Sequence, residues 1–305
     1  MTIQWAARPQ LERCALVAAF QGWNDAGNAA TDAVRWLINR FSATPVAALD
    51  AEEYLDFQAA RPTVELVNGV VRAIEWPSLT FASARVGDRD LLLMLGVEPN
   101  LRWRSFCADV VGVARETGCE IAVTLGALLG DLPHTRPVRC TGSATDEVLA
   151  ARLGMQRSRY EGPTGIVGVL HDRFRQEGFS SASIWAPVPH YVATPPNPKA
   201  TRALLGRLGQ LLDVAFDLTD LDIAAAAWER QVAEVVAGDS DVSSYVSGLE
   251  SRYDAAADAP FVEDDEDEFD DDDDDEDWFD EDDLPSGDAL AADIEQYLRD
   301  QDDDD

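Results

Sequence analysis

Short apolar runs alternate with helix-like segments along the first 217 residues, and this alternation constrains the fold more than any other feature. Five runs have the length and apolar character of strands that are buried on both faces: Cys14–Phe20, Thr44–Asp50, Arg89–Gly96, Cys119–Leu128 and Ser181–Pro189. Residues 64–77, with Asn68-Gly69 at their centre, add a predicted β-hairpin. Five further segments have helical spacing of apolar residues or a closing glycine: Ala29–Phe41, Trp103–Thr117, Thr145–Gly154, Thr164–Gly178 and Asn197–Asp213. The alternation predicts an α/β fold, with a mostly parallel sheet flanked by helices.

The pattern changes after residue 217, where the sequence predicts two helices broken at Gly238-Asp239. Asp239 or Ser240 can cap the second helix. This helical pair has too few apolar residues to form a core of its own, so we expect it to dock on the α/β body or on a second subunit. The predicted organisation has three regions: an α/β core domain at 1–217, a helical hairpin at 218–256 and an acidic tail at 257–305.

The formal net charge of −34 is concentrated at the C-terminal end. From Asp254 onward there are about 28 acidic residues and one base, Arg299, which leaves about −7 on the rest of the chain. The body has no basic stripe to displace the counterions of nucleic acid, and its charge also disfavours anionic membranes. No apolar run reaches the length of a membrane span, and the N-terminus lacks a secretion-signal pattern, so we expect a cytoplasmic protein.

The acidic segment beyond Pro260 has too high a charge density to collapse, and we expect it to be disordered. Residues 286–301 near its end have the pattern of a short amphipathic helix, which can dock in a groove of a partner protein. The candidate partner-binding residues are the tail aromatics and the apolar residues of this helix: Phe269, Trp278, Phe279, Leu290, Ile294, Tyr297 and Leu298. The alternative is that the tail only keeps the protein soluble.

The cysteines and histidines show no metal-binding pattern. The two loop histidines, His134 and His190, make neither a metal site nor a catalytic dyad by themselves. No G-x-S-x-G turn is present, so a serine hydrolase would lack its nucleophile signature. We expect neither a metal nor a cofactor. The four cysteines have no C-x-x-C spacing and are expected to be free buried thiols: Cys14, Cys107, Cys119 and Cys140.

Polar residues in the loops after the predicted strands define a candidate pocket, because ligands of parallel α/β sheets bind at the carboxyl ends of the strands. The candidates are Gln21, Asn24, Asp25, His134, Thr164, His190 and Tyr191. The stretch "GPTGIVG" at 162–168 can open a helix that accepts an anion, although it lacks the lysine of a phosphate loop. Asn24 and Asp25 also have a purely structural interpretation, since they stand just ahead of a helix and can cap it.

Three stretches together resemble a known family: "FQGWNDAGNAATDAV" at 20–34, "YEGPTGIVGVLH" at 160–171 and "VPHYVATPPNPKATRALLGRL" at 188–208. In order and spacing they resemble the proteasome assembly chaperone family of the second type, in its bacterial, actinobacterial-like branch. The resemblance covers residues 15–254. It implies an α/β fold related to the phosphorylase/hydrolase group, a proteasome-related protein partner and a homo-oligomer, for which we expect a trimer.

In one respect the chain departs from this family. The resemblance implies that archaeal and eukaryotic relatives bind proteasome rings through a final motif of a hydrophobic residue, a tyrosine and any residue. Here the last four residues are aspartates and Tyr297 lies well inside, so we expect that mode of binding not to transfer.

Two functions remain open from the sequence. The first is a non-enzymatic binding or assembly protein that presents its acidic tail to a protein partner, with charge steering the encounter. The second is a phosphorylase- or hydrolase-like enzyme, or a small-molecule binder, that uses the strand-end pocket.

Overall fold

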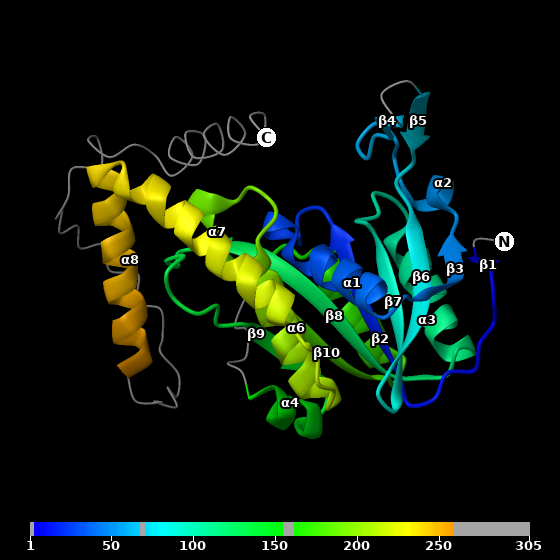
Figure 1. Cartoon of the computed structure of the whole chain (residues 1–305). Helices are drawn as coiled ribbons and strands as arrows, with labels where there is room; N and C mark the ends of the chain where they lie inside the picture. The colour runs from blue at the N-terminus through cyan, green and yellow to red at the C-terminus, as the bar shows by residue number, and fades with distance from the viewer. Residues whose placement is uncertain (1–2, 68–70, 155–161, 259–305) are drawn as a thin grey trace. The chain divides into compact units, whose positions relative to one another are not determined.

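The computed structural model describes residues 3–67, 71–154 and 162–258 (Figure 1). These residues form two compact units. The first unit holds the described residues of 1–129, 138–188 and 194–228, and the second those of 130–137, 189–193 and 229–258. The predicted partner-binding residues of the tail, from Phe269 to Leu298, lie outside the described residues, as does the expectation of disorder beyond Pro260.

An eight-stranded sheet forms the centre of the first unit, with the strand order β1-β3-β6-β7-β2-β8-β10-β9 (Figure 1). The strands span Ile3–Trp5 (β1), Cys14–Gln21 (β2), Thr44–Leu49 (β3), Leu79–Val86 (β6), Arg89–Val97 (β7), Cys119–Gly130 (β8), Thr141–Ala144 (β9) and Ser180–Pro189 (β10). β2 runs parallel to both β7 and β8, whereas the pairs β1–β3, β3–β6, β6–β7 and β9–β10 are antiparallel. The predicted α/β class is confirmed, with the parallel strands at the centre of the sheet.

Strand β2 is buried on both faces, as its continuous apolar sequence predicts. Alternate side chains enter two separate cores: Val17 and Ala19 belong to one, and Leu16 and Phe20 to the other. Helices α1 (Ala29–Arg40), α4 (Glu147–Leu153) and α6 (Pro198–Leu212) supply the first core, and helices α2 (Ala51–Tyr54), α3 (Trp103–Glu116) and α5 (Ile166–Gln176) supply the second. The helices therefore cover both faces of the sheet.

Helix α6 shows how local sequence sets an element boundary. The Asn197 side chain accepts a hydrogen bond of 2.9 Å from the backbone N–H of Ala200, and Pro198 occupies the first turn, where a missing N–H costs nothing. At the other end Asp213 adopts a left-handed conformation and stops the helix. The helix predicted over Asn197–Asp213 is confirmed.

The second unit contains most of the predicted helical pair, in which α7 spans Thr219–Ala237 and α8 spans Ser240–Asp258. Asp239 caps α8, because its Oδ1 accepts hydrogen bonds from the N–H groups of Asp241 at 2.8 Å and Val242 at 3.2 Å. The buried apolar residues of the pair are Val232 and Val236 on α7 and Val242, Val246 and Leu249 on α8. The predicted break at Gly238-Asp239 is confirmed.

The hairpin predicted over residues 64–77 is also confirmed, as strands β4 (Thr63–Val67) and β5 (Val71–Glu75). The sequence did not predict β1, β6 or β9. β9 has the sequence "TGSA" and pairs only at an edge of the sheet, so it has no apolar run to mark it. In β6 the small residues Ala82, Ser83 and Ala84 interrupt the apolar alternation. β1 and β9 are the two edge strands of the sheet, and edge strands bury less surface and therefore leave a weaker signal.

Candidate functional site

Asn28 occupies the N-cap position of helix α1, but the carboxylate of Asp25 caps its first turn, and the connection from β2 to α1 is built around Asp25. Its Oδ1 accepts hydrogen bonds from the N–H groups of Ala30 at 2.8 Å and Thr31 at 3.1 Å, and its Oδ2 accepts one from the Thr31 hydroxyl at 2.5 Å. The side chain is buried, and this burial raises the pKa of Asp25 above its ordinary value, while the hydrogen bonds from Thr31 and Ala30 lower it. All of these partners are internal, so the capping interpretation accounts for Asp25.

Asn24 has a different structural role. It is fully buried, and its Nδ2 donates a hydrogen bond of 2.7 Å to Oε1 of Glu98, at the end of β7. The same Oε1 accepts the backbone N–H of Ile166, the first residue of α5, at 2.8 Å. One carboxylate therefore joins the β2–α1 loop, the end of β7 and the start of α5.

The helix start that "GPTGIVG" predicts is present, but the chain's own carboxylate already occupies it. Glu98 takes the position at the α5 N-terminus where an external anion would bind. Thr164 is exposed, and a Cβ at Gly165 would overlap the amide group of Asn24. Glu98 was missed by the sequence analysis because a single glutamate after a strand has no distinctive pattern.

Gln21 lies at the end of β2 with a half-buried side chain, and its carbonyl accepts the backbone N–H of Glu98 at 2.8 Å. Beyond it the backbone turns through Gly27, which is left-handed with φ of 58°. A Cβ at Gly27 would approach the Cβ of Asn197 to 2.9 Å, so only glycine fits this close contact with the α6 start. These residues shape the turn.

Trp23 is the exposed large side chain of this turn, with 59% of its surface accessible, although its neighbours Asn24 and Asp25 are buried. Leu128 and Leu129, at the end of β8, are also exposed. A β-bridge between Asp25 and Ala127 places the turn after β2 beside the end of β8. We refer to Trp23, Leu128 and Leu129 as the strand-end apolar surface.

The other three predicted residues, His134, His190 and Tyr191, belong to the second unit, where the structure brings them together. The Tyr191 hydroxyl accepts the backbone N–H of His134 at 2.7 Å and lies 2.8 Å from Nδ1 of the same residue. His190 contacts the hydroxyl of Tyr245 through Nε2 at 3.2 Å and lies 3.1 Å from Asp131 through Nδ1. Burial raises the pKa of Tyr191, so its phenol stays protonated.

The same cluster fastens helix α8 to the loop at residues 130–137. Arg136 forms a bidentate ion pair with Asp254, in which Nε lies 2.9 Å from Oδ1 and Nη2 lies 2.7 Å from Oδ2. Its Nη1 also donates a hydrogen bond of 3.1 Å to Oε1 of Glu250. Thr135 also donates to Glu250, and the Tyr253 hydroxyl donates to the Pro137 carbonyl at 2.8 Å. The predicted pocket residues of the second unit are thus part of an anchor for α8.

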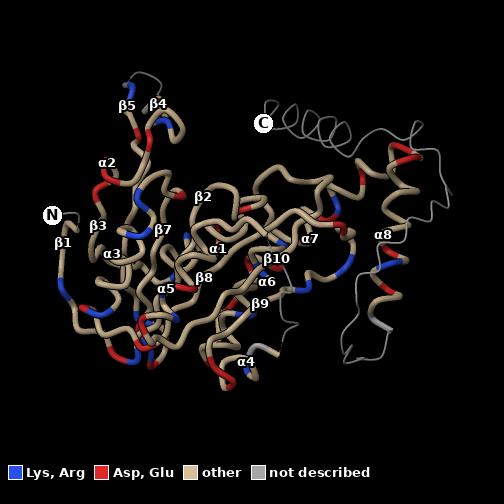
Figure 2. Tube along the Cα trace, turned by 180° about the vertical axis from the view of Figure 1, so that it is seen from behind, with Lys and Arg blue, Asp and Glu red and all other residues tan. Residues whose placement is uncertain are grey.

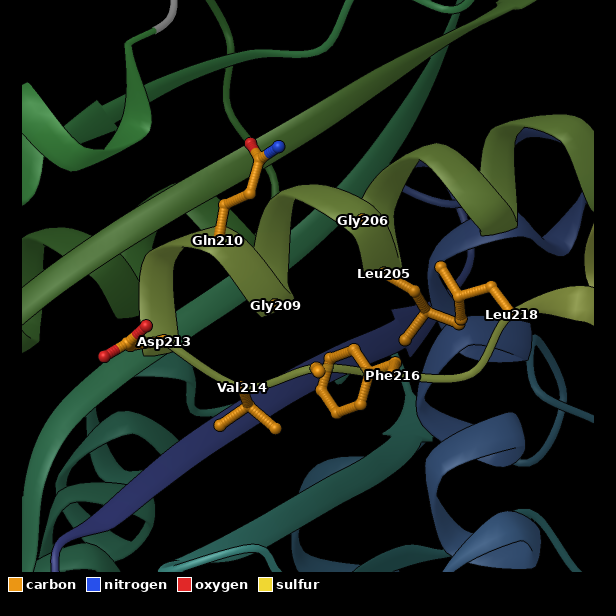
Figure 3. Close-up of a pocket in the computed structure, with 9 residues that line it drawn as sticks. Leu205, Gly206, Gly209, Gln210, Asp213, Val214, Phe216 and Leu218 are labelled. Atoms are coloured by element: carbon orange, nitrogen blue, oxygen red, sulfur yellow. The ribbon is translucent and has the colours of Figure 1, made fainter.

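A shallow surface groove of about 440 Å³ lies between α6 and the segment that follows it (Figure 3). Gly209 of the helix lies against Val214 and Phe216, and Gly206 also lines the groove (Figure 3). None of the seven predicted pocket residues lines this groove.

The four cysteines are free thiols and are buried. Cys14 and Cys119 lie in register on the parallel strands β2 and β8, with their Sγ atoms 2.9 Å apart, and the hydrogen bond between the two thiols together with burial raises the pKa of Cys14. Burial raises the pKa of Cys107 to about 12 and that of Cys140 to about 11. Within the described residues no group of three or more His, Cys, Asp and Glu side chains is arranged to hold a metal ion.

These features define an α/β protein with helices on both faces of its sheet. Most of the polar residues at the strand ends form hydrogen bonds within the chain, and a tryptophan beside them is exposed. The model of the PAC2 family matches residues 19–236, and the chain therefore belongs to the PAC2 family. This confirms the family resemblance found in the sequence.

Solved structures agree with this assignment. A PAC2 family protein from Streptomyces avermitilis is 49% identical, with a TM-score of 0.69, over 76% of this chain and 99% of its own. A proteasome-assembly chaperone homologue from Mycobacterium tuberculosis is 47% identical, with a TM-score of 0.70 and the same coverage of 76% and 99%. PbaB, an archaeal proteasome activator from Pyrococcus furiosus, is 19% identical with a TM-score of 0.63 over 77% of this chain and 98% of its own, and shares the fold. A comparison with curated proteins finds no match.

Proposed function

We propose that this PAC2-family chain is a non-enzymatic protein-binding protein that assists the assembly of a larger protein complex. The observation that carries the proposal is the strand-end apolar surface. Tryptophan is among the residues that contribute most to protein–protein binding, and here Trp23 is exposed at the end of a rigid strand. Its immediate neighbours are fixed by Glu98 and by the α1 cap, so a partner meets a preformed surface.

The hydrogen bonding at the strand ends supports binding over catalysis. A general base or nucleophile must present a polar atom to its substrate. Asp25 directs both carboxylate oxygens at α1, Asn24 directs its amide nitrogen at Glu98, and Tyr191 is engaged with His134. These groups stabilise the fold, and the apolar side chains beside Asn24 and Asp25 are the ones exposed for recognition.

We propose proteasome subunits as the partners, by analogy with the Mycobacterium tuberculosis relative described as a proteasome-assembly chaperone homologue. In the same proposal the chain acts as a homo-oligomer, a trimer, in the cytoplasm. Its acidic tail, with Phe269, Trp278, Phe279 and the apolar residues near Ile294, adds a second contact to the partner. None of the helices within the described ranges has both the length and the apolar character needed to span a membrane.

The charge distribution favours a protein partner over nucleic acid. Figure 2 shows the Lys and Arg residues as short separate segments interleaved with Asp and Glu over the described chain. A nucleic-acid surface gathers its basic residues into a stripe or patch. An acidic chain of net charge −34 is instead suited to steering toward a protein with a basic surface.

A pull-down with three proteins tests the proposal: the full chain, the variant Trp23→Ser and a chain cut after Pro260. We expect proteasome subunits with the full chain, and loss of these subunits with Trp23→Ser. The truncated chain lacks the tail but keeps Trp23, so it shows whether the tail contributes to binding in addition to the strand-end apolar surface. Identical partners for all three proteins would refute both contacts.

A thermal-shift screen addresses the enzyme alternative. Nucleosides, phosphate and acyl compounds are expected to leave the melting temperature unchanged, because a ligand that binds only the native state must raise it. A reproducible rise with one of these compounds would instead support a small-molecule site.

A further inference from the structure

Two buried thiols meet at the start of neighbouring parallel strands. β2 begins at Cys14 and β8 begins at Cys119, and these two residues pair in register. Their Sγ atoms lie 2.9 Å apart, although the residues are 105 positions apart in the sequence. We refer to Cys14 and Cys119 as the strand-start dithiol. The fold, and not a local C-x-x-C spacing, brings its two thiols together.

A β-bulge turns the thiol of Cys119 toward Cys14. Ala15, the residue after Cys14, pairs with Ile121, so β8 has one extra residue at this point. In a regular strand the side chains of residues 119 and 121 would point to the same face of the sheet. Here Cys119 belongs to the core that contains Cys14, whereas Ile121 belongs to the core on the opposite face. The bulge therefore re-aims one side chain and creates the contact between the sulfur atoms.

The separation of the two residues suits a disulfide. A disulfide bond is about 2.05 Å long and joins residues whose Cα atoms lie about 4.4–6.8 Å apart. Neighbouring strands of a sheet are about 4.8 Å apart, so residues in register already meet the second requirement. The two sulfur atoms need to approach each other by only about 0.9 Å, which rotation of the two side chains supplies.

One thiol of the pair lies next to solvent. Cys14 is fully buried, whereas 8% of Cys119 is accessible. Gly118 and Glu120, on either side of Cys119, are exposed, as is Arg13 beside Cys14. Because oxidation of a thiol follows its exposure, a small uncharged oxidant such as hydrogen peroxide reaches Cys119 first.

The surroundings of the strand-start dithiol keep it reduced at rest. The hydrogen bond between the thiols and burial raise the pKa of Cys14, so this thiol resists ionisation. A protonated thiol is a weak nucleophile, and oxidation therefore needs a sustained supply of oxidant. Disulfides inside cells are mostly transient and responsive to oxidants, and a pair of this kind belongs to that class.

We infer that the strand-start dithiol is a redox modification site, at which a hydroperoxide closes a reversible disulfide between β2 and β8. The Cys119 sulfur attacks a peroxide oxygen and the O–O bond breaks, which leaves a sulfenic acid and releases water that carries the thiol proton. The Cys14 sulfur then attacks Sγ of Cys119 and the S–O bond breaks, and a second water leaves with the Cys14 proton. Two thiols lose two electrons and one peroxide becomes two water molecules. A dithiol reductant reopens the bond by thiol–disulfide exchange.

The disulfide would join the two strands that carry the strand-end apolar surface. Trp23 follows β2, and Leu128 and Leu129 end β8, whereas the dithiol lies at the start of both strands. A bond at this position closes a loop across 105 sequence positions and restricts the unfolded chain. We expect the oxidised protein to be more stable and to keep its strand-end apolar surface, so that it goes on binding under oxidising conditions.

Thiol counting on the full chain tests the modification site. The reduced wild type has four free thiols. After treatment with hydrogen peroxide, unfolding and labelling with N-ethylmaleimide, we expect two labelled thiols. Mass spectrometry of the non-reduced digest should show peptides linked through Cys14 and Cys119, and dithiothreitol should restore all four thiols. The melting temperature of the oxidised chain should exceed that of the reduced chain.

Two single substitutions are a matched pair of controls. Cys119→Ala removes one member of the dithiol, and its three remaining thiols should stay free after the same treatment. Cys107→Ala removes a buried thiol of the same core from α3 but keeps the dithiol, so it should lose two of its three thiols. Circular dichroism before oxidation verifies that both variants fold. The linked peptides of the wild type are read without any substitution.

Four results would overturn the modification site: four labelled thiols in the peroxide-treated wild type, a disulfide between other cysteines, equal thiol loss in Cys119→Ala and Cys107→Ala, or a sulfinic acid at Cys119 without linked peptides. The pull-down with Trp23→Ser reports separately on the proposed function, because Trp23 lies outside the dithiol. A failure of one proposal is therefore distinguishable from a failure of the other.

Discussion

Asn24 and Glu98 are joined by a hydrogen bond of 2.7 Å from Nδ2 to Oε1, and the same carboxylate oxygen accepts the N–H of Ile166 at 2.8 Å. The arrangement places a fixed negative charge at the N-terminus of α5, where the helix dipole stabilises it. Asn24, one of the seven predicted pocket residues, is fully buried in this arrangement. The strand-end loops are therefore stabilised from within.

Replacing Glu98 is expected to destabilise the protein. Glu98→Ala leaves the buried amide of Asn24 and the N–H of Ile166 without their acceptor, which costs about 2–3 kcal/mol of the free energy of unfolding. Glu98→Gln keeps an acceptor oxygen and should cost about 1 kcal/mol, since the charge is lost. Urea denaturation measures both values. Equal stability of Glu98→Ala and the wild type would show that the carboxylate does not join these segments.

The same substitution should uncover an anion site. In the wild type the carboxylate of Glu98 fills the α5 N-terminus, so added phosphate has no position to occupy there. In Glu98→Ala we expect phosphate to raise the melting temperature, because it replaces the missing charge. Sodium chloride at the same ionic strength is the control. A phosphate effect of equal size in the wild type would argue against internal occupation of this site.

The sequence allowed much of the fold to be predicted but little of the site. β2 and α6 could be recognised because a continuous apolar run and an Asn-Pro start are local signals. The partner of Asn24 could not be predicted, since Glu98 is 74 residues away and the pairing depends on which strands are neighbours in the sheet. Likewise no local pattern separates the exposed Trp23 from the buried Asn24, because exposure depends on what packs across the turn.

Substitution of Asp25 should reveal its raised pKa. Asp25→Ala removes the α1 cap and should cost about 2 kcal/mol at neutral pH, and Asp25→Asn, which keeps one acceptor, should cost less. Burial makes the folded pKa higher than the unfolded value near 3.8, so the native state binds the proton more tightly. The stability of the wild type relative to Asp25→Asn should therefore rise as the pH falls from neutral toward 3.8. Denaturation at several pH values measures this, and the opposite slope would contradict the assigned direction.

Arg136 is expected to control the local stability of α8. Arg136→Gln removes the paired contacts with Asp254 and the contact with Glu250, so α8 should open more often. Hydrogen exchange of the α8 amides should then be about tenfold faster, while the strands of the first unit keep their protection. The control is Arg252→Gln, which also removes one positive charge but at an exposed position of α8. Equal protection in both variants would show that the ion pairs contribute little, as many exposed pairs do.

We propose that the strand ends of this protein bind a protein partner through the exposed Trp23. The most direct test is a calorimetric titration of purified, unassembled proteasome subunits from the organism that encodes the chain into the full chain, Trp23→Ala and the control variant Ile223→Ala, which changes an exposed apolar residue elsewhere. Removing a tryptophan that becomes buried in an interface typically costs about 2 kcal/mol of binding or more, so Trp23→Ala should bind about thirtyfold more weakly, with wild-type affinity for Ile223→Ala. Equal affinity of Trp23→Ala and the wild type, or no binding by the wild type, would contradict the account.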